Sequence, residues 1–249
     1  MEPVMLRVYN GANKGATAFF RNRPLLSTLM QELAALGQPK VSVLVHASSI
    51  GAEPYSLALW HLAHSASKFE LQIHATDIDA QFLAVAQKAE YPADLSRGLT
   101  PAEAGWFECD GKVLRVPAGA RSMVEFLPPM DFVRQRPEGR FDAVLIMNAL
   151  TYVTPAEQHL AVAGAAESSR SLLALTAFHP DSIRSDIDAV AFEPVMTNHQ
   201  LIHESWGDRL TDKPIDPRSQ EYSWRLPRYD SGQADAAWRF GALFRRRQS

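Results

Sequence analysis

The chain has little cysteine: Cys109 is the only one in 249 residues. This excludes a disulfide framework and a cysteine zinc site, and it permits a reducing compartment. No apolar run approaches the length of a membrane span, and the N-terminal residues lack the apolar core of a signal peptide. We therefore expect a soluble, cytoplasmic protein with no membrane partner.

Strongly basic surfaces and glycine-rich loops are also lacking. The formal net charge is -3, and the only basic run is Arg245–Arg247, which reads as a solvated tail. Nucleic acid is therefore not the expected partner, because binding it requires a clustered basic surface. The sequence has no G-x-G-x-x-G series either, which argues against a dinucleotide site.

Histidines occur in two pairs at helical spacing, but neither pair predicts a metal. His61 and His64 have no further ligand nearby in the sequence, so we interpret them as surface or groove residues. His199 and His203 have Glu204 close by, yet packing or a part in an acceptor pocket is the better interpretation. We expect no metal site.

One stretch organises the chain. Val41–Val45 is a β-branched run typical of a buried parallel strand, and a turn of small residues follows it. A helix then begins at Glu53-Pro54, since proline is suited to a first helical turn. Strand, turn and helix form half of a βαβ unit, and such units bind ligands beyond the carboxyl ends of their strands.

Further strands complete an α/β pattern. A second strand, Leu71–Ala75, leads to Asp77, and Phe141–Asn148 is the most apolar strand and therefore central. Residues 90–130 are less regular, and we expect a short insertion there. Trp238–Arg246 alternates like a closing strand. We expect residues 1–249 to form a single domain.

Polar residues at the strand ends suggest a ligand. Asp77 is placed to accept hydrogen bonds from ribose hydroxyls, although a helix cap is the alternative, a role that Asp79 fills as well. Asn148 could bind the polar end of a ligand. Glu53 would repel pyrophosphate, so a cation with a ribose and no phosphate fits better. S-adenosylmethionine is such a ligand.

Four blocks in this order resemble the CheR-type chemoreceptor methyltransferases, which esterify glutamate side chains using S-adenosylmethionine. The blocks are Thr17-Ala18-Phe19-Phe20-Arg21-Asn22, Ala47-Ser48-Ser49-Ile50-Gly51-Ala52-Glu53-Pro54-Tyr55-Ser56, Ala75-Thr76-Asp77-Ile78-Asp79 and Phe141–Val144 through Asn148-Ala149-Leu150-Thr151-Tyr152. The resemblance implies a class I methyltransferase (Rossmann-like) fold, whose seven-stranded, mostly parallel sheet ends in an antiparallel C-terminal strand. It also implies S-adenosylmethionine as the cofactor.

The resemblance implies a role for each matching residue. Thr17 and Arg21 would lie over the cofactor and the reacting carboxylate, while Ala47 and Glu53 would contact the methionine moiety. Asp77 would hold the ribose hydroxyls.

Three residues further along the chain complete the implied site. Asn148 and Ala149 would line the cofactor, and Tyr152 would lie near the transferred methyl group. Asp131 is our own choice for the adenine amino group, because it lies where a third nucleotide-contacting strand should end. Arg21 and Tyr152 are the expected catalytic residues, as a carboxylate clamp and as a positioning hydroxyl.

The chain departs from the family pattern at several positions. Where the family has a second acidic residue in the turn, this chain has Ala52. Where the family usually has an arginine just before the strand-end asparagine, this chain has Met147. We expect the family's N-terminal helical domain to be missing, because the first block begins almost at residue 1. The part from about residue 155 to residue 249 diverges.

Three functions therefore stay open. The first is methylation of a carboxylate on a protein glutamate, with residues 90–130 presenting a strand edge or groove to a peptide. The second is methylation of a small molecule in a biosynthetic pathway, in a pocket walled by His199–Trp206 and Trp224–Tyr229. The third is a module that binds S-adenosylmethionine without turnover. The oligomeric state is not predicted.

Overall fold

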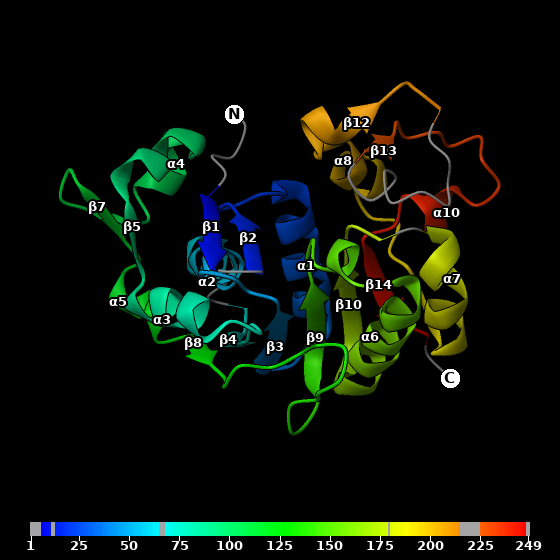
Figure 1. The fold of residues 1–249 in the computed structure, drawn as a ribbon, viewed down its shortest axis with the longest axis horizontal. Coiled ribbons are helices and arrows are strands. Elements are labelled where there is room, and N and C mark those ends of the chain that lie inside the picture. Colours follow the sequence, from blue (N-terminus) through cyan, green and yellow to red (C-terminus); the bar gives the residue numbers. More distant parts are fainter. Residues whose placement is uncertain (1–5, 11–12, 65–67, 179, 215–224, 248–249) are drawn as a thin grey trace. The chain divides into compact units, whose positions relative to one another are not determined.

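The computed structural model describes residues 6–10, 13–64, 68–178, 180–214 and 225–247 (Figure 1). The chain divides into two compact units, of which unit one comprises residues 1–21 and 30–131 and unit two comprises residues 22–29 and 132–249. Helix α1, Arg23–Ala35, belongs partly to each unit. The expectation of a single domain over residues 1–249 stays a prediction.

Unit one contains a parallel sheet, its helices and a small second sheet. Its elements are β1 (Leu6–Asn10), β2 (Asn13–Thr17), β3 (Lys40–His46), α2 (Ala52–His64), β4 (Glu70–Ala75), α3 (Ala80–Lys88), β5 (Glu90–Pro92), the 3-10 helix η1 (Ala93–Gly98), α4 (Pro101–Ala104), β6 (Glu108–Cys109), β7 (Val113–Arg115), α5 (Ala118–Arg121) and β8 (Val124–Phe126).

The parallel sheet of unit one follows from the apolar strand patterns. β3 pairs in parallel with β4, so that Val43 lies opposite Ile73, and β4 pairs in parallel with β8. Val41, Val43 and Ile73 are fully buried, as expected for strands covered on both faces. Helix α2 packs against β4 and β8. The predicted first and second strands are therefore confirmed.

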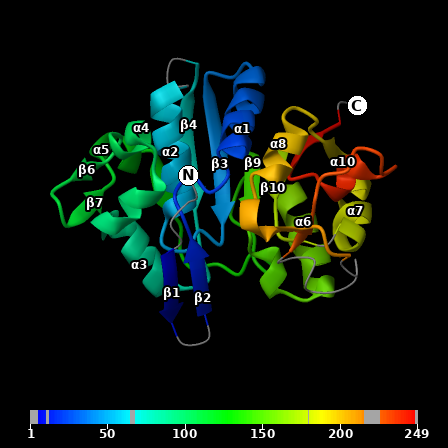
Figure 2. The same ribbon diagram turned by 90° about the horizontal axis from the view of Figure 1, so that it is seen from above.

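Residues 90–115, within the stretch where the sequence predicts a short insertion, contain a small antiparallel sheet of order β5-β7-β6. Within unit one it lies beside α3, α4 and α5 (Figure 2), on the side of the parallel sheet where Figure 1 labels β8. β8 also falls within residues 90–130, but it belongs to the main sheet.

Unit two contains the second half of the α/β pattern. Its elements are β9 (Phe141–Ile146), the 3-10 helix η2 (Leu150–Tyr152), α6 (Pro155–Ser168), β10 (Ser169–Leu175), α7 (Pro180–Ala189), β11 (Phe192–Pro194), α8 (His199–Glu204), the 3-10 helix η3 (Gly207–Arg209), β12 (Leu210–Thr211), β13 (Leu226–Pro227), α10 (Ala236–Arg239) and β14 (Leu243–Arg246).

In unit two, β9 and β10 are parallel, and β14 is antiparallel to both β10 and β11, between which it lies. Every residue of β9 is buried, which confirms its expected central character. Helix α6 packs on β9 and β10. A capping box of Thr154 and Glu157, with Pro155 in the first turn, explains why that helix begins where it does.

The closing strand is shorter than predicted. Trp238 and Arg239 lie in α10, and only Leu243–Arg246 forms the strand. Asp235 accepts hydrogen bonds from Arg239 one helical turn away, at 2.8 and 3.2 Å, which favours a helical turn here over an extended strand.

With three strands in unit one and four in unit two, the chain has the predicted seven-stranded, mostly parallel sheet with an antiparallel C-terminal strand. Among the described residues, no helix has both the length and the hydrophobicity needed to cross a bilayer.

Candidate active site

The turn after β3 has an unusual backbone. Ala47, Ser49 and Gly51 have positive φ angles of 50°, 51° and 90°. The Ser48 N–H donates to the Thr76 carbonyl at 3.0 Å, which ties this turn to the end of β4. At Gly51 a Cβ atom would lie 2.9 Å from the Ala86 Cβ, so both the φ angle and the crowding require glycine.

Glu53 lies at the start of α2 and is held by residues of the first sequence block. Its Oε2 accepts a hydrogen bond from Thr17 Oγ1 at 2.7 Å, and its Oε1 lies 3.8 Å from Arg21 Nη1. Burial raises the pKa of Glu53, while the Arg21 charge and the Thr17 hydrogen bond act in the opposite direction. The structure therefore brings Thr17, Arg21 and Glu53 together.

Arg21 is held by more than this ion pair. Its Nη2 donates to the Ala16 carbonyl at 2.5 Å, and its side chain is only 13% exposed. The prediction gave Arg21 the role of clamping the acceptor carboxylate. In this structure its guanidinium faces Glu53, so the clamp role stays a prediction.

Asp77 receives backbone hydrogen bonds at both oxygens. Ser49 N donates to Oδ2 at 2.8 Å, and Asp79 N donates to Oδ1 at 2.9 Å. Burial raises the pKa of Asp77, and these bonds partly offset the rise. The cap of α3 is Asp79, whose side chain accepts from Gln81 N and Phe82 N. Asp77 is therefore not needed as a helix cap.

Three serines that were not predicted as site residues shape the same turn. Ser56 Oγ accepts from Phe20 N at 2.9 Å and donates to the Ala52 carbonyl at 2.7 Å, which fixes the chain before Arg21 onto α2. The hydroxyls of Ser48 and Ser49 are buried and have no hydrogen-bond partner among the described residues. Buried hydroxyls of this kind mark a place where a ligand is expected to bind.

The structure does not place Asp131 at the end of a strand, which was the reason for predicting it as an adenine contact. The strand β8 ends at Phe126, five positions earlier in the chain, so Asp131 does not lie at a strand end. Its neighbour Met130 does donate a backbone hydrogen bond to the Asp77 carbonyl at 2.9 Å. The loop that carries Asp131 is therefore anchored at Asp77, and its adenine role stays a prediction.

Unit two contains the remaining predicted residues. Asn148 follows β9 with a positive φ of 58°, and its N–H donates to Thr176 Oγ1 at 2.8 Å. Ala149 is buried, whereas Tyr152, at the end of η2, is 53% exposed. The turn is further fixed by Gln158, whose Nε2 donates to the Leu150 carbonyl at 2.9 Å.

An arginine from far along the chain contacts this loop. Arg209 Nη1 donates to Asn148 Oδ1 at 3.0 Å, and the Arg209 guanidinium lies 5.2 Å from the centre of the Trp206 ring. No pattern in the sequence predicts this pairing, because the two residues are 61 positions apart in a divergent part of the chain.

The histidine pair in α8 serves packing. His199 and His203 are buried, and their Nε2 atoms lie 3.0 and 2.8 Å from the Ala237 and Pro227 carbonyls. Burial lowers the pKa of both imidazoles. Tyr229 and Phe240 contact His203, while Trp224 lies outside the described residues. Within the described ranges no cluster of His, Cys, Asp and Glu could hold a metal ion.

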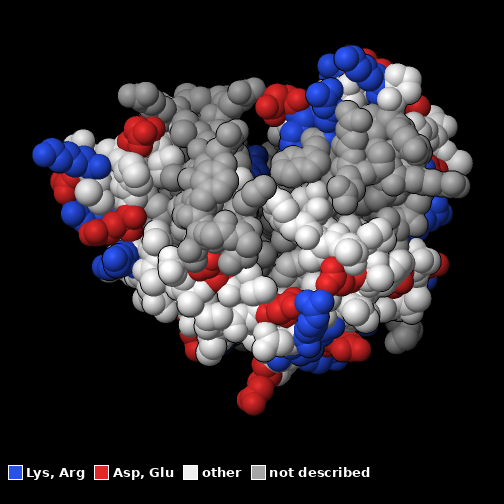
Figure 3. Space-filling model, in the orientation of Figure 1, with Lys and Arg blue, Asp and Glu red and all other residues white. Residues whose placement is uncertain are grey.

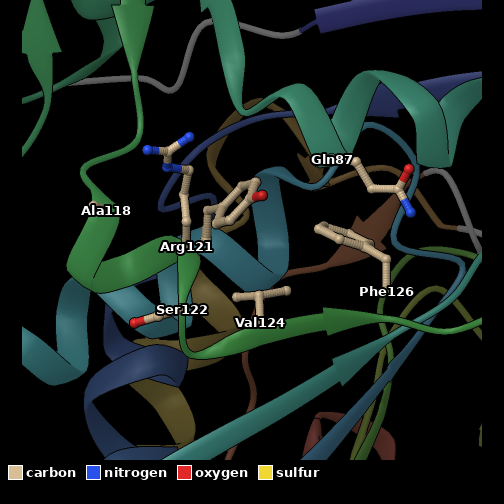
Figure 4. A pocket seen from close by; sticks show the side chains of 7 residues that line it. Gln87, Ala118, Arg121, Ser122, Val124 and Phe126 are labelled. Atoms are coloured by element: carbon tan, nitrogen blue, oxygen red, sulfur yellow. The ribbon is translucent and has the colours of Figure 1, made fainter.

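A hollow of about 480 Å³ in unit one was not predicted. It is lined by Tyr55, Gln87, Ala118, Arg121, Ser122, Val124 and Phe126. Figure 4 shows Arg121 and Gln87 on opposite sides of it. Tyr55 connects its wall to α3, since its hydroxyl donates to the Ala86 carbonyl at 2.9 Å. None of the predicted site residues lines this hollow.

Comparison with known families gives a match over most of the chain. The family model described as "CheR methyltransferase, SAM binding domain" matches residues 15–185. This description agrees with the cofactor predicted above, S-adenosylmethionine.

Individual relatives match a shorter stretch. A chemotaxis protein methyltransferase of Vibrio parahaemolyticus is 32% identical over 139 residues, covering 53% of this chain and 50% of that protein. A probable chemotaxis protein methyltransferase of Rhizobium etli is 29% identical over 136 residues, covering 51% and 50%. The chain thus spans about half the length of the curated relatives it matches.

Among solved structures, the chain is similar to a magnesium protoporphyrin IX methyltransferase of Synechocystis with bound S-adenosylmethionine. The identity is 17%, the match covers 69% of each chain, and the TM-score is 0.43. A likeness of this degree carries no argument about function.

Proposed function

The chain belongs to the CheR methyltransferase SAM-binding domain family, and from this premise we propose that it transfers the methyl group of S-adenosylmethionine to a carboxylate oxygen. The observation that carries the proposal is the pair of acids beside the β3–α2 turn of unit one. Glu53 and Asp77 are both buried enough for burial to raise the pKa, and both are fixed by hydrogen bonds.

The two acids suit the two polar ends of the cofactor. Glu53 would accept the amino group of the methionine moiety, and the cation would offset the cost of keeping this carboxylate charged while buried. Asp77 would accept the ribose hydroxyls. The backbone of Ala47 and the buried hydroxyls of Ser48 and Ser49 would complete this half of the site, with Asp131 near the adenine amino group.

The residues present fit direct attack by a carboxylate. A carboxylate is already ionised at neutral pH, so its oxygen can attack the sulfonium methyl carbon without a general base. The carbon–sulfur bond breaks, its electron pair stays on sulfur, and the products are a methyl ester and S-adenosylhomocysteine. What the protein must supply is orientation and the removal of water between the two reactants.

We assign this positioning to Arg21 and Tyr152, with Thr17 holding Glu53 in place. Arg21 would turn toward the acceptor once the cofactor's amino group occupies Glu53, because that cation would compete for the same carboxylate. Tyr152, which is largely exposed, would direct its hydroxyl to the acceptor oxygen. Asn148 and Ala149 would line the cofactor.

A protein glutamate is the acceptor class we favour, since the matched relatives are chemotaxis methyltransferases. The small β5-β7-β6 sheet, with the two-residue strand β6 at one edge, is a surface on which a peptide strand could pair. A free carboxylic acid and binding without turnover remain the alternatives. The cytoplasm is the proposed location.

The first test is calorimetric titration of the full chain with S-adenosylmethionine and S-adenosylhomocysteine. We expect saturable binding to the wild type and a loss of about 10- to 100-fold in Asp77→Ala, since hydrogen bonds to a charged group contribute about 1.5–3 kcal/mol. Lys40→Ala is the control, because Lys40 is exposed and pairs with exposed Glu70. Absence of binding to the wild type would refute the proposal.

The second test separates catalysis from binding. Transfer of radioactive methyl groups to glutamate-containing peptides and to free dicarboxylic acids should be lost in Arg21→Ala and reduced in Tyr152→Phe. S-adenosylhomocysteine should still bind Tyr152→Phe with wild-type affinity. Wild-type protein that binds the cofactor but methylates neither class of acid would point to the binding module instead.

A further inference from the structure

The Ile50 carbonyl, in the turn after β3, needs a hydrogen-bond donor from outside the helix that follows. Ile50 is buried, and a buried carbonyl without a partner is costly. In a helix the donor would be the N–H four positions along, but that residue is Pro54, which has no N–H. The donor that this carbonyl has among the described residues is the Tyr91 hydroxyl, at 2.7 Å.

Tyr91 reaches the turn from the small β5-β7-β6 sheet. It is the middle residue of β5, lies opposite Leu114 of β7 and is only 2% exposed. The other face of this sheet is charged, since Arg115 pairs with Glu90 at 2.8 Å, and basic and acidic side chains lie next to one another on this part of the surface (Figure 3). Successive side chains of a strand alternate between its faces, so Tyr91 points inward.

The Tyr91 ring is fixed by packing as well as by its strand. The Phe19 ring meets it edge-on, with the two centroids 5.0 Å apart and the planes at 89°. Phe19 belongs to the first sequence block, two residues before Arg21. The hydroxyl is therefore presented to the turn by a rigid, buried ring.

The turn is built to receive this hydroxyl. A Cβ atom on Gly51 would lie 3.2 Å from the Tyr91 hydroxyl oxygen, so glycine leaves room for it. On the other side of Ile50, the Ser49 N–H donates to Asp77 Oδ2 at 2.8 Å. The Tyr91 bond thus fixes the peptide group between the residue that holds Asp77 and the glycine that leads into α2.

We propose that Tyr91 is a positioning residue for S-adenosylmethionine, whose hydroxyl holds the turn after β3 in the conformation that accepts the methionine and ribose ends of the cofactor. Without this bond the peptide group between Ile50 and Gly51 can rotate to find another donor. The turn is then ready in only a fraction of the molecules, and the affinity falls by that fraction. The proposal deepens the proposed function and rests on it.

The test is calorimetric titration of the full chain with S-adenosylmethionine and with S-adenosylhomocysteine. Tyr91→Phe keeps the ring that packs against Phe19 and removes only the hydroxyl. It should bind both ligands about 3- to 10-fold more weakly than the wild type. The loss should be equal for the two, because they share the methionine and ribose ends.

Tyr55→Phe is the matched control. Tyr55 is also buried, and its hydroxyl also donates to a backbone carbonyl, that of Ala86 in α3, at 2.9 Å. Urea unfolding should show a similar loss of stability in the two variants. Only Tyr91→Phe should lose affinity for the cofactor. If Tyr91 served stability alone, the two variants would bind the cofactor equally well.

A second measurement follows the turn in the absence of the cofactor. Hydrogen exchange of the backbone amides of residues 47–53 should be faster in Tyr91→Phe than in the wild type. It should be unchanged in Tyr55→Phe. Unchanged exchange in Tyr91→Phe would overturn the proposal, and so would an affinity equal to that of Tyr55→Phe.

Failure of the proposed function looks different. If the wild type binds the cofactor but transfers no methyl group, the catalytic proposal fails while the titration of Tyr91→Phe still decides the role of Tyr91. If the wild type binds neither ligand, the proposed function fails at its first step. The exchange measurement then decides by itself whether Tyr91 holds the turn.

Discussion

Replacing Gly51 by alanine should destabilise unit one and weaken cofactor binding. Gly51 has a φ of 90°, where an L side chain is strained. Its added Cβ would lie 2.9 Å from the Ala86 Cβ, and 3.2 Å from both the Tyr55 ring and the Tyr91 hydroxyl oxygen. Two of these neighbours are fixed, because the Tyr55 and Tyr91 hydroxyls donate to the Ala86 and Ile50 carbonyls.

The magnitude follows from two contributions. The unfavourable φ costs about 1–2 kcal/mol, and inserting a methyl group into a packed region costs about 1–3 kcal/mol. Gly37→Ala is the matched control, because Gly37 also has a positive φ, of 66°, but has no atom within 4 Å of its added Cβ. Gly51→Ala should therefore lose about 1–3 kcal/mol more of the free energy of unfolding than Gly37→Ala does.

Urea unfolding of both variants, followed by fluorescence and circular dichroism, gives this difference directly. Gly51→Ala should also bind S-adenosylmethionine more weakly than the wild type, since the turn carries the Ser49 N–H that holds Asp77. Gly37→Ala should bind normally. Equal losses of stability in the two variants would show that the turn is not packed against Ala86 and the two tyrosines as described.

Three further predictions concern titration and capping. The pKa of Glu53 is raised by burial, against the opposing effect of Arg21, so the affinity of the wild type for the cofactor should fall as the pH drops through that raised pKa. Glu53→Gln should bind the cofactor weakly at every pH. The same dependence of affinity on pH in Glu53→Gln and in the wild type would contradict this. Asp79→Ala should lower the free energy of unfolding by about 1 kcal/mol, because it removes the cap of α3. Unlike Asp77→Ala, it should leave the affinity for the cofactor unchanged. A loss of affinity in both variants would refute the assignment of Asp79 to the cap and of Asp77 to the cofactor. Burial lowers the pKa of His203, so the unfolded chain takes up the proton first, and the free energy of unfolding should fall as the pH drops below about 6.5. His203→Gln keeps an N–H for the Pro227 carbonyl, so in urea unfolding its free energy of unfolding should fall less with decreasing pH than that of the wild type. An equally steep fall in the variant would show that His203 does not cause this pH dependence.

Local signals predicted the parallel sheet and its turns well. The valine-rich β3, the wholly buried and mostly apolar β9 and the proline-started α6 are each specified by residues within a few positions of one another. The choice between Asp77 and Asp79 as the helix cap could not be made from the sequence, because both acids stand just before α3. It depends on which carboxylate the Ser49 N–H reaches, and that is set by a turn 28 positions earlier.

The divergent part of the chain shows what such signals miss. Trp238–Arg246 alternates like a strand, yet an ion pair between Asp235 and Arg239 accompanies a helical turn in its first residues. The contact of Arg209 with Asn148 joins two loops of irregular backbone, and no periodicity predicts which arginine reaches which strand end. Predictions failed where particular side-chain contacts, rather than the apolar periodicity, decide the outcome.

The position of β14 has a consequence for the synthesis of the protein. β14 lies between β10 and β11, so neither strand has its final neighbour until residues 243–246 have been made. Chains fold from the N-terminus as they emerge from the ribosome, so unit one can assemble its parallel sheet while unit two still has an open edge at apolar β10. Exposed strand edges associate readily with other chains. During translation we therefore expect unit two, rather than unit one, to be the half whose apolar strand edge needs protection until β14 is complete.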